Sequence, residues 1–335
     1  LICRLTGLDV ANASMYDGGT ALAEAALMAL RIKKKRKKIL IDSNINPHYK
    51  SIIKTYLNLL DTEFVEIFSN NDRINQNELK KHLDDNTAAF LFQTPNFLGT
   101  IEDYQDIVNL VHENGALCAV SVYPIALGLI ESPGTYDIDI VTGEGQSLGN
   151  PLNFGGPYFG FMATKKALMR QLPGRIAGAT LDRNKERSYV LTLQAREQHI
   201  RRHRATSNIC SNQNLCALRA LIYLTTLGKK GFEELSQINY NKATYLKNAV
   251  SSIKNIEIFN QGETFNEFVV KLPEDAGKLV NKLKEKNILA GLPLKSVLSE
   301  TNKLPDIDKL LLVNATEITK KEWMDEFVQV MEAVL

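Results

Sequence analysis

The sequence predicts an α/β protein in which a large domain with a mostly parallel sheet precedes a smaller C-terminal α+β domain. The chain has 335 residues, of which 44% are hydrophobic, and short apolar runs alternate with helical patterns over residues 39–164. A chain of this length can form one large core and a second, smaller one. Strands that alternate with helices are typical of a parallel sheet covered on both faces.

Six apolar runs are expected to form the strands of the large domain. They are residues 39–43, 64–68, 88–92, 117–123, 138–142 and 158–164. Consecutive apolar positions favour strands that are buried on both faces. Between these runs, Pro47 begins an amphipathic helix that extends to Leu60, and residues 102–114 form another that ends before Gly115.

The pattern changes after Asn208, where the helical segments become longer and the strands fewer. Helices are expected at residues 212–227 and 232–253, and strands near 265–272 and 310–313. We place the boundary at Gly228, which predicts a large domain of residues 1–228 and a small domain of residues 229–335.

Composition excludes several classes of protein. Forty basic and 38 acidic residues leave a net charge of +2, which argues against a nucleic-acid-binding protein. The longest apolar run, residues 116–130, is shorter than the ~20 residues of a membrane helix. The four cysteines lack CxxC spacing and lie in apolar contexts, which predicts reduced core thiols and a cytoplasmic location. Because Leu1 is not a methionine and no signal-like segment follows, we expect an N-terminal portion to be missing.

Two glycine-rich segments are candidate ligand sites. Residues 17–20, Asp-Gly-Gly-Thr, enter an alanine-rich helix whose free N–H groups could hold a phosphate, although a helix cap by Asp17 or Thr20 is the simpler interpretation. Residues 143–156 contain five glycines and begin at the carboxyl end of a predicted strand. Open α/β sheets bind ligands at that edge, so we favour a functional role for this segment.

Charge is distributed unevenly along the chain. Residues 165–204 hold 11 basic and three acidic residues, whereas residues 82–164 hold ten acidic residues and no Lys or Arg. The basic segment could attract an anionic ligand or partner, and it could equally be a solvated face or an intersubunit contact. His199 and His203 have the i, i+4 spacing of metal ligands, but no carboxylate motif accompanies them and we predict no metal site. The basic run from Arg31 to Lys38 is expected to end a helix and continue as a solvated loop.

Five ungapped segments resemble subunit 1 of the two-subunit glycine dehydrogenase (decarboxylating), the P-protein family of the glycine cleavage system. They are TGLDVANASMYDG (residues 6–18), QTPNFLG (93–99), GEGQSLG (143–149), QAREQHIRR (194–202) and ATSNIC (205–210). The resemblance implies a pyridoxal-phosphate-dependent transferase fold of the aspartate aminotransferase type (fold type I). It also implies an α2β2 heterotetramer with subunit 2, which decarboxylates glycine and passes the aminomethyl group to the lipoyl arm of the H-protein.

The resemblance also indicates two losses in this chain. Gln146 falls where the catalytic subunit has the Schiff-base lysine, and an amide cannot form an imine. Tyr123 falls where an acid would face the ring nitrogen of the cofactor, a position at which subunit 1 of this family commonly keeps an aspartate.

We therefore expect a non-catalytic partner subunit with no catalytic residue of its own, in a complex whose pyridoxal phosphate is anchored by subunit 2. Thr206, Ser207 and Asn208 are candidates for contacts with the partner's cofactor site. One alternative is a self-sufficient pyridoxal-phosphate transferase that uses Lys165 or Lys166. Another is a scaffold without enzymatic role that presents its basic face to the acidic H-protein.

Overall fold

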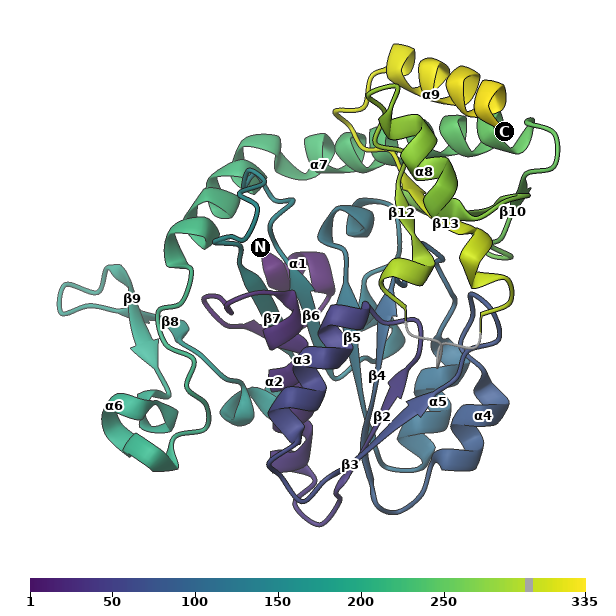
Figure 1. Cartoon of the computed structure of the whole chain (residues 1–335). Coiled ribbons are helices and arrows are strands. Elements are labelled where there is room, and N and C mark those ends of the chain that lie inside the picture. Colours follow the sequence, from purple (N-terminus) through teal and green to yellow (C-terminus); the bar gives the residue numbers. More distant parts are fainter. Residues whose placement is uncertain (299–303) are drawn as a thin grey trace.

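A seven-stranded sheet forms the centre of the large domain in the computed structural model, which describes residues 1–298 and 304–335 (Figure 1). Its strands are β1 (Val10–Ala11), β2 (Lys38–Asp42), β3 (Glu63–Ile67), β4 (Thr87–Thr94), β5 (Leu117–Val122), β6 (Ile140–Glu144) and β7 (Gly160–Thr164). Their order is β1-β7-β6-β5-β4-β2-β3, in which β6 to β3 run parallel and β7 runs antiparallel to both of its neighbours. The predicted mostly parallel sheet is confirmed, with every predicted strand of this domain present.

Helices cover both faces of the sheet, as the apolar strands require. The helices of this domain are α1 (Ile2–Thr6), α2 (Gly18–Ile32), α3 (Pro47–Leu57), α4 (Gln76–His82) and α5 (Gln105–Glu113). Successive strand residues face opposite sides, so that Ile39, Ile41 and Leu91 pack with α2 and α3, while Leu40 and Phe90 pack with α4 and α5. Because β2, β4 and β5 are buried almost throughout, their polar backbone groups are satisfied by the neighbouring strands.

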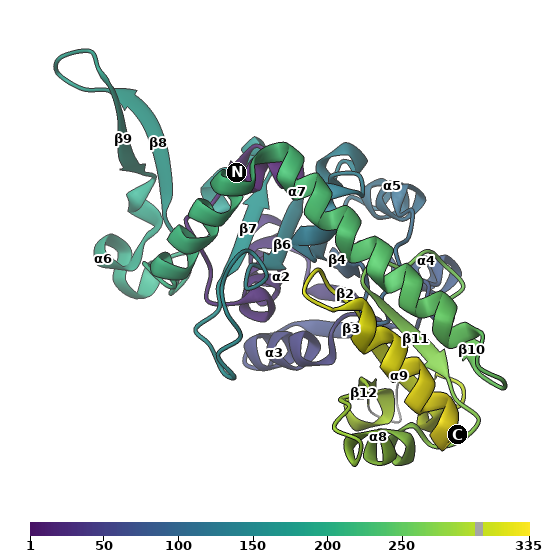
Figure 2. The same ribbon diagram turned by 90° about the horizontal axis from the view of Figure 1, so that it is seen from above.

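The C-terminal part is a four-stranded antiparallel sheet packed against helices (Figure 2). It contains β10 (Glu257–Ile258), β11 (Glu267–Lys271), β12 (Leu292–Pro293), β13 (Leu310–Asn314), α8 (Ala276–Lys284) and α9 (Lys321–Val334). A separate apolar cluster joins α8 and α9 to β11 and β13. The predicted small α+β unit is thereby present, and the boundary at residue 228 remains a prediction.

The segment between the two sheets contains the two expected helices, which meet at a kink. Together they form α7 (Asn214–Ser251), and Gly228, whose φ of 64° lies in the left-handed region, interrupts the helical backbone between them. Before it, β8 (Ile176–Leu181) and β9 (Arg187–Thr192) form a hairpin that the sequence reading missed and that projects from the body of the molecule (Figures 1 and 2). Its exposed side chains lack the strict alternation by which a strand is recognised.

Several smaller expectations are wrong. Lys38 is not in a solvated loop but begins β2, where it is buried and forms a 2.5 Å ion pair with Asp84. Helix α3 ends before Leu60, α5 is shorter than expected, and β6 lies two residues later than predicted. All four cysteines are free, but Cys210 is exposed and does not belong to the core. Within the described residues, no helix combines the length and apolar character needed to cross a membrane.

Asp72 connects the two sheets through a buried carboxylate. Its Oδ2 accepts hydrogen bonds from the Thr100 hydroxyl at 2.8 Å and from the backbone N–H groups of Gln261 at 2.9 Å and Gly262 at 3.3 Å. Gln261 and Gly262 precede β11, so this side chain fixes the C-terminal sheet against the loops that follow β3 and β4.

We expect Asp72→Ala to lower the free energy of unfolding by about 3 kcal/mol, because the buried Thr100 hydroxyl and two backbone N–H groups lose their charged acceptor. Urea unfolding measures the change, and Asp85→Ala, at an exposed position, is the matched control. Equal free energies of unfolding for the two variants would show that the hydrogen bonds of Asp72 contribute nothing to stability.

Candidate functional site

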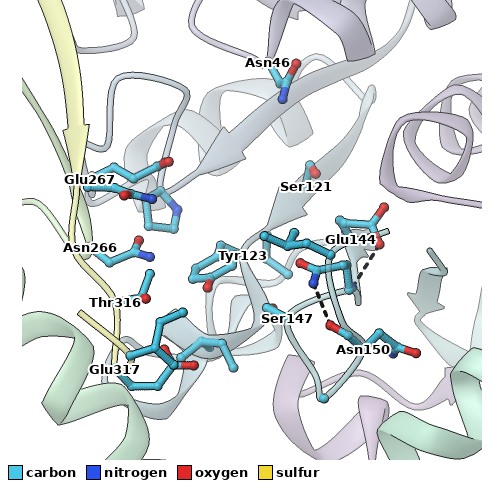
Figure 3. A pocket seen from close by; sticks show the side chains of 18 of the residues that line it. Asn46, Ser121, Tyr123, Glu144, Ser147, Asn150, Asn266, Glu267, Thr316 and Glu317 are labelled. Atoms are coloured by element: carbon cyan, nitrogen blue, oxygen red, sulfur yellow. Dashed lines mark hydrogen bonds between the residues drawn. The ribbon is translucent and has the colours of Figure 1, made fainter. Parts of the chain in front are cut away.

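A cavity of about 780 Å³ lies at the carboxyl ends of the parallel strands, between the two sheets (Figure 3). The loops after β2, β4, β5 and β6 form one wall, and α7, β11 and the segment after β13 form the other. Its polar lining comprises Asn46, Gln93, Ser121, Tyr123, Glu144, Gln146, Ser147, Asn150, Arg219, Asn266, Glu267, Asn314, Thr316 and Glu317. The position agrees with the edge at which open α/β sheets bind ligands.

The glycine-rich segment after β6 forms part of this wall, but its glycines have structural causes. A Cβ on Gly143 would lie 2.4 Å from the ring of Phe161, and one on Gly145 would lie 2.2 Å from the ring of Phe159. Gly149 has a φ of 83° and packs against Tyr223. The close approach inferred from the sequence is therefore an approach to aromatic rings of the same chain.

Gln146 lines the cavity with its amide turned back to its own loop. Its Nε2 donates to the carbonyl oxygen of Asn150 at 2.7 Å, and its backbone N–H donates to Glu144 Oε1 at 3.0 Å (Figure 3). The side chain thus holds the loop closed.

Tyr123 follows β5 and extends toward Asn266 on the opposite wall (Figure 3). Its ring lies 6.1 Å from that of Phe265, centroid to centroid, and burial raises the pKa of its hydroxyl. A neutral phenol here offers a hydrogen bond and no negative charge.

Glu144 occupies the start of α2, the second candidate site of the sequence. Asp17 and Thr20 cap this helix, since Asp17 Oδ1 accepts from Thr20 N at 2.7 Å and Thr20 Oγ1 accepts from Asp17 N at 3.2 Å. Glu144 Oε2 accepts from the N–H of Gly18 at 2.9 Å. Burial raises the pKa of Glu144 to about 7. The cap interpretation is confirmed, and the position at which the helix could hold a phosphate contains a carboxyl group of the chain.

The opposite wall supplies residues that the sequence reading did not select. Asn266 and Glu267 stand at the beginning of β11, and Thr316 and Glu317 follow β13 (Figure 3). Burial raises the pKa of Glu267 to about 7. The available signal was that polar residues directly flank the apolar runs of these two strands.

The other candidate residues lie outside this cavity. Thr206, Ser207 and Asn208 follow a basic segment near the end of α2. His199 lies in α6 (Gln198–Arg201), which ends before His203, and Arg202 has a φ of 54°. The predicted i, i+4 alignment of the two imidazoles is therefore wrong because the helix is too short. Within the described residues, no cluster of three or more His, Cys, Asp or Glu side chains could hold a metal ion.

The architecture and the place of the cavity define the class of protein. The chain has the pyridoxal-phosphate-dependent transferase fold, which it shares with a NifS-like protein at a TM-score of 0.71 and with Sphingomonas wittichii serine palmitoyltransferase at 0.70, each at 15% sequence identity. These two chains are covered to 85% and 73%, and both alignments span 99% of this chain.

Closer relatives identify the family. The model of the glycine cleavage system P-protein matches residues 1–331, and the chain belongs to this family. It is 50% identical over its whole length to probable glycine dehydrogenase (decarboxylating) subunit 1 of Citrifermentans bemidjiense, and 45% identical over 99% of its length to that of Thermomicrobium roseum. The alignments cover 74% and 73% of those proteins.

A solved structure agrees with this assignment. A crystal structure of glycine decarboxylase (P-protein) of the glycine cleavage system, in inhibitor-bound form, aligns with a TM-score of 0.92 and 37% identity. It matches all of this chain and 74% of that one. Within this family, the chain is thus similar over its whole length to proteins named as subunit 1 of glycine dehydrogenase (decarboxylating).

The lining of the cavity does not suit pyridoxal phosphate held by this chain. No lysine lines it among the described residues, so nothing there can bond the cofactor aldehyde. A phosphate at the start of α2 would meet the carboxyl group of Glu144, with Asp17 nearby as a second acid. Glu144, Glu267 and Glu317 face the cavity against one basic residue, Arg219, which further disfavours a dianion.

We expect the stability contribution of Glu144 to fall as pH rises. The carboxyl group titrates near 4.5 in the unfolded chain and near 7 in the folded one, so in that window the folded chain binds the extra proton. The free energy of unfolding of the wild type, minus that of Glu144→Gln, should decrease by about 2 kcal/mol from pH 4.5 to 7 and then level.

Urea titrations at several pH values measure this difference, in which other titrating groups cancel. Glu113→Gln, at an exposed position of α5, provides the matched control. A difference for Glu144→Gln that is flat with pH would contradict the assignment.

Proposed function

We propose that this chain is the non-catalytic subunit of glycine dehydrogenase (decarboxylating) and that subunit 2 holds the pyridoxal phosphate. The observation that carries the proposal is the pair Gln146 and Glu144. An amide hydrogen-bonded to Asn150 stands in the loop where the catalytic subunit has its Schiff-base lysine, and the Glu144 carboxyl group accepts a hydrogen bond from the N–H of Gly18, at the helix start that would hold the phosphate. In the proposed α2β2 complex, this chain completes the frame of the partner's site, and the complex passes the aminomethyl group of glycine to the lipoyl arm of the H-protein.

Tyr123 supports the same proposal. On the family's pattern it replaces the acid that faces the cofactor ring nitrogen, and a buried phenol with a raised pKa cannot supply that negative charge. Two separate groups for the chemistry are therefore lost together, while the fold that the partner would require is kept.

The alternative transferase would use Lys165 or Lys166, and geometry argues against both. Strand β7 runs antiparallel to β6, with Gly160 opposite Glu144 and Thr164 opposite Ile140. Lys165 thus lies at the other edge of the sheet, about 15 Å from the cavity at the usual rise per strand residue. There its Nζ forms ion pairs of 2.8 Å with Asp137 and Asp139.

A cytoplasmic location remains part of the proposal.

The three candidates for contact with the partner's cofactor site differ in their availability. The Ser207 hydroxyl donates to Glu24 Oε1 at 2.8 Å and accepts from the N–H of Ile209 at 3.2 Å, so it stabilises its own loop. Asn208 is exposed, and the side chains of Thr206 and Asn208 form no hydrogen bond within the described chain. We propose that Thr206 and Asn208 reach the partner and that Ser207 positions them.

The isolated chain should form no borohydride-reducible adduct with pyridoxal phosphate, because its cavity offers no amine. Absorbance at the imine band and mass spectrometry after reduction measure this, with subunit 2 as the positive control. Exchange of glycine carboxyl with bicarbonate should require both chains. A stoichiometric adduct on one lysine of this chain would overturn the proposal, and exchange by subunit 2 alone would favour the scaffold without enzymatic role.

Thr206→Val and Asn208→Ala should each weaken pyridoxal phosphate binding by the reconstituted complex about tenfold, since each removes a hydrogen bond to a charged group. Neither should change the stability of the chain alone. Ser207→Ala should instead lower that stability by about 1 kcal/mol. Cofactor titration and urea unfolding separate the two effects. Unchanged cofactor affinity in both of the first variants would exclude these residues from the partner's site.

A further inference from the structure

A second cavity, of about 570 Å³, is surrounded by basic side chains. It lies between the end of α2, the turn after β7 and the segment that follows β9. Its basic lining residues are Arg31, Lys34, Arg170, Arg196, Arg201 and Arg204, and its other lining residues are Gln171, Leu193, Ala195 and Thr206. No acidic residue lines it among the described residues. The structure thus brings the basic segment of residues 165–204 together with the basic end of α2.

Two of the arginines are held in place by the backbone. Arg196 donates from Nε to Leu193 O at 3.1 Å, from Nη2 to Gly174 O at 2.9 Å and from Nη1 to Leu172 O. A guanidinium has five N–H donors, so two of them remain for a ligand. Arg31 donates to Gln171 O at 3.3 Å, and its buried Nε has no acceptor among residues 1–298 and 304–335. Positively charged donors are therefore fixed in advance around the cavity.

The remaining charges are not neutralised by this chain. Lys34, Arg170 and Arg204 are exposed and form no ion pair within the described residues, and Arg201 donates only to Ala195 O. Glu24 lies 3.9 Å from Arg31 but also accepts from Ser207, and burial raises its pKa. Glu197 faces Arg175 and His199 at 3.8 and 3.6 Å, outside the cavity. Six cations therefore converge with little compensation.

We propose that this cavity binds a phosphate group, either of a free small molecule or presented by another subunit. A solvated surface would let like charges spread apart, whereas here they converge on one hollow. Guanidinium groups match the oxygens of phosphate in geometry, and several forks can bind one dianion. The Thr206 hydroxyl, which lies in the same wall, supplies a neutral donor. Thr206 is also a proposed contact to the partner's cofactor site, so a phosphate presented by another subunit rests on the proposed function, whereas a free phosphate ligand does not.

Isothermal titration of the full chain with inorganic pyrophosphate tests the proposal. Binding should be saturable with one site and should weaken with added NaCl, because exposed charges are screened. The triple variant Lys34→Gln, Arg170→Gln, Arg204→Gln should bind about 100-fold more weakly, since it loses three charge-assisted contacts. These residues contact no other described side chain through an ion pair, so the fold should be retained, which circular dichroism checks.

The matched control carries Arg183→Gln, Lys185→Gln and Arg187→Gln in the β8–β9 hairpin, which removes the same charge outside the cavity. It should bind as the wild type does. Absence of binding by the wild type, or equal loss in both triple variants, would overturn the proposal.

A second titration, on the complex with subunit 2, separates the two sources of the phosphate. If the complex binds pyrophosphate with the affinity of the isolated chain, the ligand is a free phosphate compound. If the complex no longer binds pyrophosphate at this cavity, the partner already fills the cavity with its own phosphate. Both arms require the isolated chain to bind first. The two titrations measure binding and require neither glycine nor cofactor turnover. A negative result would therefore reject the phosphate site without rejecting the proposed function.

Discussion

The carboxyl group of Glu144 connects the start of α2 to the loop after β6, the two segments that a phosphate-bearing cofactor would need. It accepts hydrogen bonds from Gly18 at the start of α2 and from Gln146 in the loop after β6. Helix N-termini favour a negative group because their N–H donors are free and the helix dipole points toward them. Here the chain satisfies that preference with its own side chain. The free N–H of Gly18 is thereby satisfied by a side chain of the chain itself. The carboxyl group is buried in this position, and burial raises its pKa to about 7.

The wall of the main cavity is stabilised by contacts within the chain itself. The cavity wall needs a loop closed after β6, and Gln146 closes it through Asn150. Aromatic rings fill the space beside Gly143 and Gly145. Glu144 and Gln146 thus form hydrogen bonds within the chain itself, and these contacts support the proposal that another subunit holds the cofactor. The basic cavity at the end of α2 is a different case, because there the backbone holds Arg31 and Arg196 in place and the described residues provide little negative charge to compensate the six cations.

Sequence reasoning succeeded where one element decides the outcome. The apolar runs of β2, β4 and β5 predicted buried strands because their periodicity reflects burial on both faces. It failed where the environment is set by distant segments. Lys38 was predicted to lie in a solvated basic run, yet it is buried in β2 and forms an ion pair with Asp84. His199 and His203 had a suitable spacing, but the helix that should align them ends at Arg201. Asn266 and Glu267 could not be assigned to the cavity, because that requires knowing how β11 packs against the large domain.

The sequence by itself determined the fold class and the family, and it predicted Gln146 and Tyr123 as the substituted positions. The fold class follows from local periodicity, and the family follows from the ungapped motifs and their order along the chain. Only the tertiary structure decided that Glu144 accepts a hydrogen bond from the start of α2, that Ser207 is hydrogen-bonded to Glu24, and that Arg31 and Arg204 share a cavity. Those are contacts between segments more than 100 residues apart, and their distances depend on how the sheet and helices pack, which no local pattern records.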